Sequence, residues 1–537
     1  MTTLIPKFDL KNGGSIPTGA VNRPINQKLA ELVSVKDFGA LGDGITDDVT
    51  AIQNAIASLA TTGGEVYFPS GTYLMSSSLT PISNVSLKGA GIDATIIKNT
   101  GTGVSPANIT LTCFGTLTGN WTTGQTTTAT TYAINTPVET QPNVTLTTAG
   151  NAGNFTVGGY AMLSGPTHST NFWYPTWVGQ IAAVDATTGI VTFNENLPLG
   201  GANWTLIQKV LVLPQNIKVS NMTIVGTGNE AVQFSVTKNI ILENLSIVAG
   251  TAGLSGCTFS PAASRNVTVQ NCIFNGNYVE VLGCFDSKII NNSFNGGSLV
   301  FDGGTQDSII KGNIINNPTQ IGVGTDGISI VTESNRNIID SNYVINVYPN
   351  YAAIKVEGVS LNEGNNIISN NIITGKDVST TYGIAINTSN YNTVIGNLLS
   401  SFYKGIDIVN NSVHQSVTGN TFNNITIPYD LDTTSSIQAP FTSTTWPTIT
   451  LGSTNPDVSN GNYYGCYQSS PTSVTTFTGG KSGQILVIYF NTANTTLVAS
   501  GNLHLLNSIN YTPPAGTMMQ FVYDGSTWRE LSRSQNN

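Results

Sequence analysis

The stretch KVSNMTI at residues 218–224 is the first of nine similar phrases that fill the chain between residues 216 and 424. Each phrase is a short Ile- or Val-rich run, then Asn, then another apolar residue. The others read ILENLSI, VTVQNCIF, IINNSF, IIKGNII, IIDSNYVI, IISNNII, VIGNLL and VTGNTF. A repeat of 21 to 29 positions indicates a solenoid. The Asn residues that define it are Asn221, Asn244, Asn271, Asn292, Asn313, Asn342, Asn371, Asn397 and Asn420.

The residues of the repeat indicate strands. Each period holds two or three runs of alternating apolar residues, separated by Gly and Asn, which is the pattern of strands joined by turns. The sequence therefore predicts an all-β chain that folds as a parallel β-helix. Asn suits the turns because it tolerates a positive φ and bonds to its own backbone. Stacked turns would also align the Asn side chains in a ladder, so we expect these residues to be structural.

Composition restricts the possible partners. Only 9% of the 537 residues are charged, 39% are hydrophobic, and the net charge is −9 with 20 Lys and Arg. This balance argues against a nucleic-acid partner, and a neutral polar surface with aromatic residues suits glycans better. The five Cys residues are scattered and odd in number. Neither a disulfide framework nor a zinc site is therefore expected, and no cofactor is predicted.

Neither a membrane span nor a signal peptide is expected. No apolar run reaches the length of a membrane span, so no membrane partner is predicted. The N-terminus MTTLIPKFDLKNGG lacks the basic-then-apolar pattern of a secretory signal.

Changes of pattern divide the chain into five segments. Residues 1–33 read as an extended arm, and residues 34–100 hold a helix and the first coils. Residues 101–210 lose the Asn rhythm and predict an inserted small β-domain. Residues 211–430 are the main β-helix, and residues 431–537 are a linker and a C-terminal β-domain with hairpin signals.

One amphipathic helix is predicted over residues 51–60. Ile52, Ile56 and Leu59 form its apolar stripe, and Thr46, Asp47 or Asp48 is expected to cap it. A helix at this place would cover the open end of the first coil and block edge pairing there.

The same region carries a family resemblance. VKDFGALGDGITDDVTAIQNAI, followed by GGEVYFPSGTYL, resembles the opening motif of the pectate-lyase/polygalacturonase β-helix superfamily. With NRPINQKLAELV before it, the segment is most similar to phage tail spikes. The resemblance covers residues 20–98 closely, and the Asn repeats extend it to about residue 424.

The resemblance implies a right-handed β-helix and a homotrimer held together by the C-terminal β-domain. It implies attachment to a phage tail or baseplate protein through residues 1–33, hence a location on the virion tail. The implied function is to bind a bacterial surface polysaccharide, capsule or O-antigen, and to depolymerise it. Asp47 and Asp48 are then cap residues rather than catalytic ones.

Outward-facing acids are the candidate catalytic residues. Alternate residues of each strand point outward, and glycoside hydrolysis usually needs two carboxyl groups. Asp302 and Glu357 should lie two rungs, about 9.6 Å, apart, which suits an inverting pair. Glu333 and Glu357 should lie on adjacent rungs, which suits a retaining pair. The predicted catalytic residues are therefore Asp302, Glu333 and Glu357.

Other residues are candidates for substrate binding. Lys355 would orient the substrate or tune a neighbouring carboxyl. Asp326, in GTDGISI, resembles part of a polygalacturonase motif, but the other polygalacturonase motifs are absent, so that mechanism does not carry over. In FWYPTW, Trp173 and Trp177 would stack on sugar rings, unless they belong to a core or an interface. Tyr351 and Tyr382 complete the predicted binding residues.

Two other functions stay open. A polysaccharide lyase would act by β-elimination and would use Lys355, Tyr351, Tyr382 or His414. A receptor-binding spike would bind the polymer without cleaving it. A site between subunits would instead bring in acids such as Asp407 or Asp286.

Overall fold

The computed structural model describes most of the chain after residue 31. The described residues are 32–101, 110–117, 131–138, 140–164, 176–198, 204–227, 231–248, 257–275, 278–316, 326–332, 334–347, 349–358, 364–376, 380–432, 435, 448–449, 454–458, 463–480 and 484–535. They fall into two compact units, Met1–Ser334 and Asn335–Asn537, and each unit is described by itself. No helix among these residues is long and apolar enough to cross a membrane.

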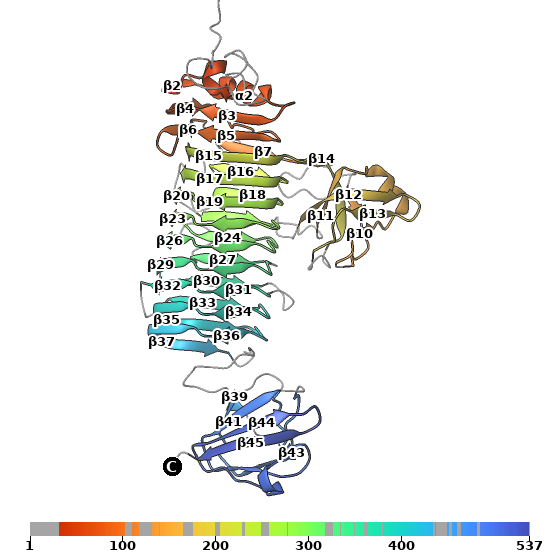
Figure 1. The fold of residues 1–537 in the computed structure, drawn as a ribbon, viewed down its shortest axis with the longest axis vertical. Coiled ribbons are helices and arrows are strands. Elements are labelled where there is room, and N and C mark those ends of the chain that lie inside the picture. Colours follow the sequence, from red (N-terminus) through yellow and green to blue (C-terminus); the bar gives the residue numbers. More distant parts are fainter. Residues whose placement is uncertain are drawn as a thin grey trace, which may run out of the picture. The chain divides into compact units, whose positions relative to one another are not determined.

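The first unit begins with a cap. Its elements are β1 (Val33–Ser34), η1 (Val35–Phe38), β2 (Asp43–Asp47) and α2 (Val49–Ser58). The helix begins two residues before the predicted start, and Figure 1 shows it at the end of the first coil. Asp47 accepts a hydrogen bond from the Val49 N–H (3.2 Å). The Asp48 carboxylate instead accepts from the N–H groups of Leu41 and Gly42 (2.7 and 3.0 Å), so it holds the preceding loop.

The coils of the first unit are built from short parallel strands, and the predicted parallel β-helix is confirmed (Figure 1). Strands one coil apart pair in register: in one pair Thr268 lies beside Lys288, so that coil takes 20 residues. The strands are β3 (Gly64–Phe68), β4 (Gly71–Met75), β5 (Val85–Gly89), β6 (Thr95–Asn99), β7 (Leu111–Phe114), β15 (Gln215–Val225), β16 (Val232–Ser235), β17 (Lys238–Val248), β18 (Cys257–Ala262), β19 (Arg265–Gln270), β20 (Ile273–Asn275), β21 (Tyr278–Leu282), β22 (Lys288–Ile290), β23 (Ser293–Asn295), β24 (Leu299–Asp302), β25 (Ile309–Lys311), β26 (Ile314–Asn316) and β27 (Ile328–Val331).

The second unit continues the same kind of coil and ends in a separate β-domain. Its coil strands are β28 (Ile338–Asp340), β29 (Tyr343–Val347), β30 (Ala352–Glu357), β31 (Ile367–Ser369), β32 (Ile372–Gly375), β33 (Tyr382–Asn387), β34 (Thr393–Ile395), β35 (Leu398–Val409), β36 (Ser416–Thr418) and β37 (Thr421–Leu431). The C-terminal sheet contains β38 (Thr448–Ile449), β39 (Tyr463–Cys466), β41 (Ile485–Phe490), β43 (Leu503–His504), β44 (Thr517–Tyr523) and β45 (Trp528–Gln535). A two-stranded sheet pairs β40 (Thr472–Val474) with β42 (Thr495–Leu497).

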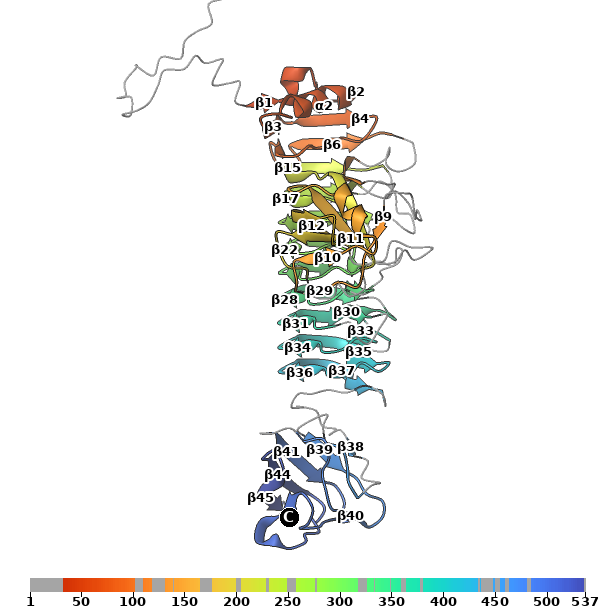
Figure 2. The same ribbon diagram turned by 90° about the vertical axis from the view of Figure 1, so that its right-hand side faces the viewer.

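A small antiparallel domain interrupts the coils between β7 and β15. Its core packs Trp177, Trp204 and Phe193 against Phe285 of a coil. Figures 1 and 2 show β11 and β12 beside the coils of the first unit. The strands are β8 (Thr116–Leu117), β9 (Thr131–Ala133), β10 (Asn143–Thr145), β11 (Tyr160–Ser164), β12 (Trp177–Asp185), β13 (Ile190–Phe193) and β14 (Leu206–Val212).

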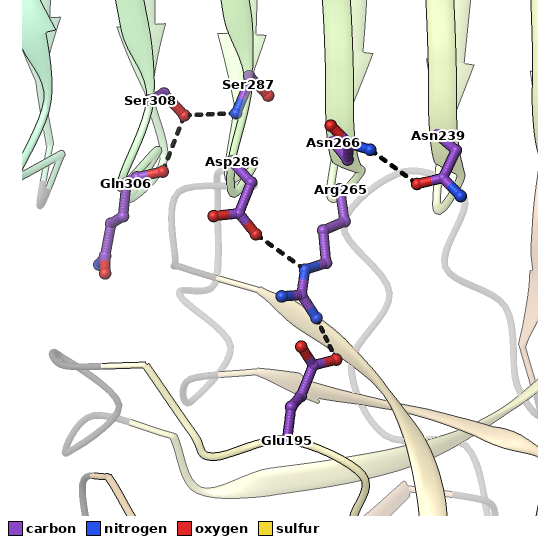
Figure 3. A network of polar contacts seen from close by, with 8 residues as sticks. All are labelled: Glu195, Asn239, Arg265, Asn266, Asp286, Ser287, Gln306 and Ser308. Atoms are coloured by element: carbon purple, nitrogen blue, oxygen red, sulfur yellow. Dashed lines mark hydrogen bonds and ion pairs between the residues drawn. The ribbon is translucent and has the colours of Figure 1, made fainter.

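One arginine joins this domain to the coils (Figure 3). Arg265 on β19 bonds Asp286 of the next coil (Nε to Oδ2, 3.0 Å) and Glu195 of the inserted domain. Its guanidinium also lies 5.7 Å from the Trp177 ring centroid. The side chain is only 17% exposed, so both carboxylates satisfy a largely buried charge. These contacts fix the inserted domain against the coils.

The nine repeated Asn residues occupy two different positions. Asn221, Asn244 and Asn271 sit in turns with φ of 58°, 52° and 55°. The other six point inward and are buried, namely Asn292, Asn313, Asn342, Asn371, Asn397 and Asn420. The repeated Asn moves from the turn position to the inward position between Asn271 and Asn292. These two residues are therefore 21 positions apart, although the coil takes 20 residues. Both predicted roles therefore occur, the turn and the ladder, but at different residues.

The inward Asn side chains form a hydrogen-bonded ladder. Asn371 Oδ1 accepts from the backbone N and from Nδ2 of Asn342 (2.9 and 3.0 Å). Asn371 Nδ2 donates to Asn397 Oδ1 and to the Ile339 carbonyl (both 2.9 Å). Each amide therefore satisfies turn groups that the coil hides from water. A second buried column of the same kind contains Asn337, Asn366, Asn392 and Gln415.

Replacing Asn371 with Ala should destabilise the second unit. Two buried donors of Asn342 would lose their acceptor, which costs about 2–3 kcal/mol. The matched control is Asn423→Ala, because Asn423 is an exposed residue of β37 and should change stability little. Urea unfolding of the two variants measures the difference. Equal stability would contradict a supporting role for the ladder.

Candidate functional site

The outward face of one sheet carries the candidate residues. We use the name third sheet for two sets of strands, each described within its own unit. They are β7, β16, β18, β21, β24 and β27 in the first unit, and β30, β33 and the C-terminal parts of β35 and β37 in the second. Their inward residues are fully buried, for example Phe301 and Ile330. In the first unit the alternating residues Glu280, Val300, Asp302 and Ser329 point outward. Val300 pairs in register with Ser329.

Asp302 is an outward residue that is nevertheless buried. It ends β24 and is only 4% exposed. The Gly303 N–H donates to its Oδ1 (2.6 Å). Burial raises the pKa of Asp302 above its usual value, against the opposing effect of hydrogen bonds from the Thr332 side chain and the Gly303 N–H. A carboxyl that keeps its proton more readily is suited to act as a general acid.

Asp326 also lies on this face. It immediately precedes β27 and is 8% exposed, and the Ser329 hydroxyl lies 3.4 Å from its Oδ2. Glu333, a predicted catalytic acid, lies outside the described residues. Asp302 belongs to the first unit and Glu357 to the second, so their two-rung separation stays a prediction.

In the second unit, Lys355 and Glu357 form an ion pair. Both lie on β30 and point outward, and Lys355 Nζ is 2.6 Å from Glu357 Oε2. Asn387, the register partner of Glu357 on β33, donates from Nδ2 to Glu357 Oε1 (3.0 Å). Lys355 is therefore in contact with a neighbouring carboxylate, and its predicted role in tuning that carboxyl stays a prediction.

A second ion cluster of this unit contains Asp407, which the sequence suggested only for a site between subunits. Lys404 Nζ lies 3.1 Å from Asp407 Oδ1, 2.6 Å from Asp430 Oδ2 and 5.5 Å from the Tyr382 ring centroid. Asp407 is 8% exposed, and burial raises its pKa, opposed by Lys404. Asp407 and Asp430 are register partners on adjacent strands.

The sequence signal for this cluster is partial. Strand alternation in KGIDIV already places Asp407 outward. The contact between Lys404 and Asp430 crosses a whole coil, and no local pattern marks it.

The other predicted aromatic residues behave differently. Tyr382 is half-buried at the Lys404 cluster, and Tyr351 is half-buried just before β30. Trp177 is 2% exposed, with Phe193 edge-on to its ring (centroids 4.9 Å apart) and Arg265 over it. Trp177 therefore packs in the core of the inserted domain and offers no face to a sugar. Trp173 lies outside the described residues.

The described part of the chain holds no group of three or more His, Cys, Asp or Glu residues that could bind a metal ion. The four Cys residues whose side chains are described are buried thiols. The described face offers carboxyl groups, two lysines, a tyrosine and amide side chains.

Comparison with protein families gives two matches. Residues 32–255 match the model of the rhamnogalacturonase A/epimerase, pectate lyase-like family. Residues 442–529 match the phage depolymerase C-terminal beta sandwich domain. The two matches lie in different parts of the chain, the first on the cap, the early coils and the inserted domain, and the second on the C-terminal β-domain.

Individual relatives match over a short segment. The mannuronan C5-epimerase AlgE2 of Azotobacter vinelandii is 52% identical over 73 residues, which is 12% of this chain. The pre-neck appendage protein of Bacillus phage B103 is 48% identical over 65 residues. The chain matches only 7% of the length of either relative.

One solved structure matches over nearly the whole chain. The tailspike protein gp49 of Pseudomonas phage LKA1 covers 93% of this chain, and 98% of that protein is covered. The TM-score is 0.50 and the sequence identity is 13%, so this likeness concerns the fold. Together, the two family matches and this likeness of fold support a pectate-lyase-like β-helix protein that resembles phage tailspikes.

Proposed function

We propose that this protein is part of a phage tail, where it binds a bacterial surface polysaccharide and cleaves it by glycoside hydrolysis. The depolymerase-type C-terminal domain and the likeness to a pre-neck appendage protein support the location and the polymer substrate. The homotrimer and the attachment through residues 1–33 belong to the same proposal. Residue-level support comes from one observation: Asp302 faces outward on the third sheet, is buried, and binds its proton more tightly than usual.

Asp302 is the general acid in this proposal. It gives its proton to the glycosidic oxygen as the bond between that oxygen and the anomeric carbon breaks. A second carboxylate, Glu357 or Glu333, either removes a proton from the attacking water or attacks the anomeric carbon itself. Lys355 lies against this carboxylate, with its Nζ 2.6 Å from Glu357 Oε2, and so helps to hold it in place. Asp326, Tyr351 and Tyr382 would contact the bound sugars.

A lyase is the second candidate. It is favoured by the segment that is 52% identical to a mannuronan C5-epimerase, because epimerisation and β-elimination both begin by removing a proton from a uronate ring. In that case Lys355 or a tyrosine would act in place of the carboxyl pair. A receptor-binding spike that does not cleave the polymer would need neither a carboxyl pair nor a lysine or tyrosine that acts on the sugar.

Asp302→Asn should abolish cleavage without harming the fold. Loss of a general acid lowers the rate about 10²–10⁴-fold. Because the folded pKa is raised, the stabilising contribution of Asp302 is present below the unfolded pKa and is lost as pH rises through the folded pKa. At neutral pH the Asn variant should therefore be at least as stable as wild type.

Release of reducing ends and thermal unfolding at pH 7 measure the two effects. The control is Glu243→Gln, which removes an outward carboxylate paired with Lys218 on another sheet and should keep full activity. An active Asp302→Asn variant would exclude the assigned acid role.

The products should distinguish hydrolysis from elimination. Hydrolysis gives oligosaccharides with new reducing ends and no unsaturated uronate, so the ultraviolet absorbance of such a double bond should not appear. Glu357→Gln should reduce this cleavage strongly. The measurement is product analysis on purified capsule and lipopolysaccharide from a panel of strains. Unsaturated ends would establish the lyase, and binding without shortening of the polymer would leave only the receptor-binding function.

A further inference from the structure

We infer that the glycan bound on the third sheet is uncharged or carries amino groups, and that it is not a polyuronate. This inference rests on the proposed function and names its substrate class. The supporting observation is that both lysines on the described strands of this face already pair with protein carboxylates.

In the second unit, the described third-sheet strands contain two lysines, and carboxylates occupy both. Lys355 pairs with Glu357 at 2.6 Å. Lys404 pairs with Asp407 at 3.1 Å and with Asp430 at 2.6 Å. Lys404 is also poorly exposed, at 19% of its side chain. A sugar carboxylate would have to displace a protein carboxylate to reach either ammonium group.

The balance of charge on this face is negative. Three carboxylates accompany the two lysines, so the face carries about one negative charge when all are ionised. In the first unit, the third-sheet strands β7, β16, β18, β21, β24 and β27 contain no Lys or Arg in their sequences. The outward acids there are Glu280 and Asp302, with Asp326 just before β27. On the described third-sheet strands, neither unit therefore contains a Lys or Arg whose charge is not already matched by a protein carboxylate.

The remaining polar groups suit neutral sugars. Asn410 Nδ2 donates to Asn387 Oδ1 (2.7 Å), and Asn387 donates to Glu357, so a chain of amides runs across three rungs. Sugar hydroxyls can both donate to the carboxylates and accept from the amides. Amino groups on the sugars would bind the carboxylates more strongly still. The Tyr382 ring beside Lys404 supplies an apolar surface.

This substrate class bears on the reaction. Elimination needs a uronate, whose carboxylate must be neutralised as the ring proton leaves. On the described strands of the third sheet, each cation that could neutralise it is already ion-paired with the protein. A neutral or amino-bearing glycan leaves hydrolysis as the reaction that the face supports, in contrast to the mannuronan-modifying relative.

The test compares each polymer with its carboxyl-reduced form. Capsule and lipopolysaccharide glycans from a panel of strains are treated so that uronic acids become neutral hexoses, and retention of the full-length protein on both forms is measured. The expected result is that the polymer retained by the protein is retained at least as well after reduction. A polymer that loses at least about tenfold in affinity on reduction, which is 1.4 kcal/mol, would overturn the inference while leaving the proposed function intact. Retention of no polymer in either form would overturn the proposed function, and the inference with it.

Two variants with the same change in net charge test the face itself. Asp430→Asn leaves Lys404 with one carboxylate on the third sheet, whereas Glu243→Gln frees Lys218 on another sheet. Retention on polygalacturonate at low salt should rise several-fold for Asp430→Asn and less for Glu243→Gln, because only the first removes a carboxylate from a lysine beside the proposed site. Equal retention by the two variants would mean that the third-sheet lysines do not decide charge selectivity, and would overturn the inference.

Discussion

Parallel pairing between residues one coil apart is the constraint on which the rest of this structure depends. It brings residues 20 or more positions apart in the sequence into one column, such as Thr268 beside Lys288. Where a turn backbone is hidden from water, as at Asn342, its polar groups need buried partners that accept and donate hydrogen bonds. The inward Asn ladder meets that need, because an amide can donate to one coil and accept from the next.

The same columns create the outward chemistry. A carboxylate on one strand lies beside its register partner on the strand of the next coil, as Asp407 lies beside Asp430. Two such acids on adjacent strands would repel each other, and Lys404 between them offsets that repulsion. Asp302 has no lysine in the third-sheet strands of its unit, and its environment favours the protonated form instead. One architecture thus produces carboxyl groups paired with a lysine and a carboxyl group without one on the same kind of surface.

The inserted domain shows how a solenoid carries an added element. Phe285 of the coils packs against Trp204 of the domain. Arg265 of the coils pairs with Glu195 of the domain (Figure 3), so the contact is both apolar and ionic. Trp177, one of the aromatic residues predicted to stack on sugar rings, packs instead in the core of the inserted domain. Large aromatic rings are used for packing as readily as for sugar binding, and sequence clustering does not separate the two uses.

The sequence by itself determined the parallel β-helix and the cap helix, because a repeat of alternating Ile and Val with turn-forming Asn has few other ways to bury its apolar face. It also determined that Asp302, Glu357 and Asp407 point outward, since side-chain alternation is a local property. Only the tertiary structure decided which of the repeated Asn residues points inward. The sequence repeats look the same whether the Asn lies at the turn position, as Asn271 does, or one position later and inward, as Asn292 does. It alone decided that Asp302 is buried and that Lys404 lies between two aspartates, because those environments are made by neighbouring coils that no short stretch of sequence contains.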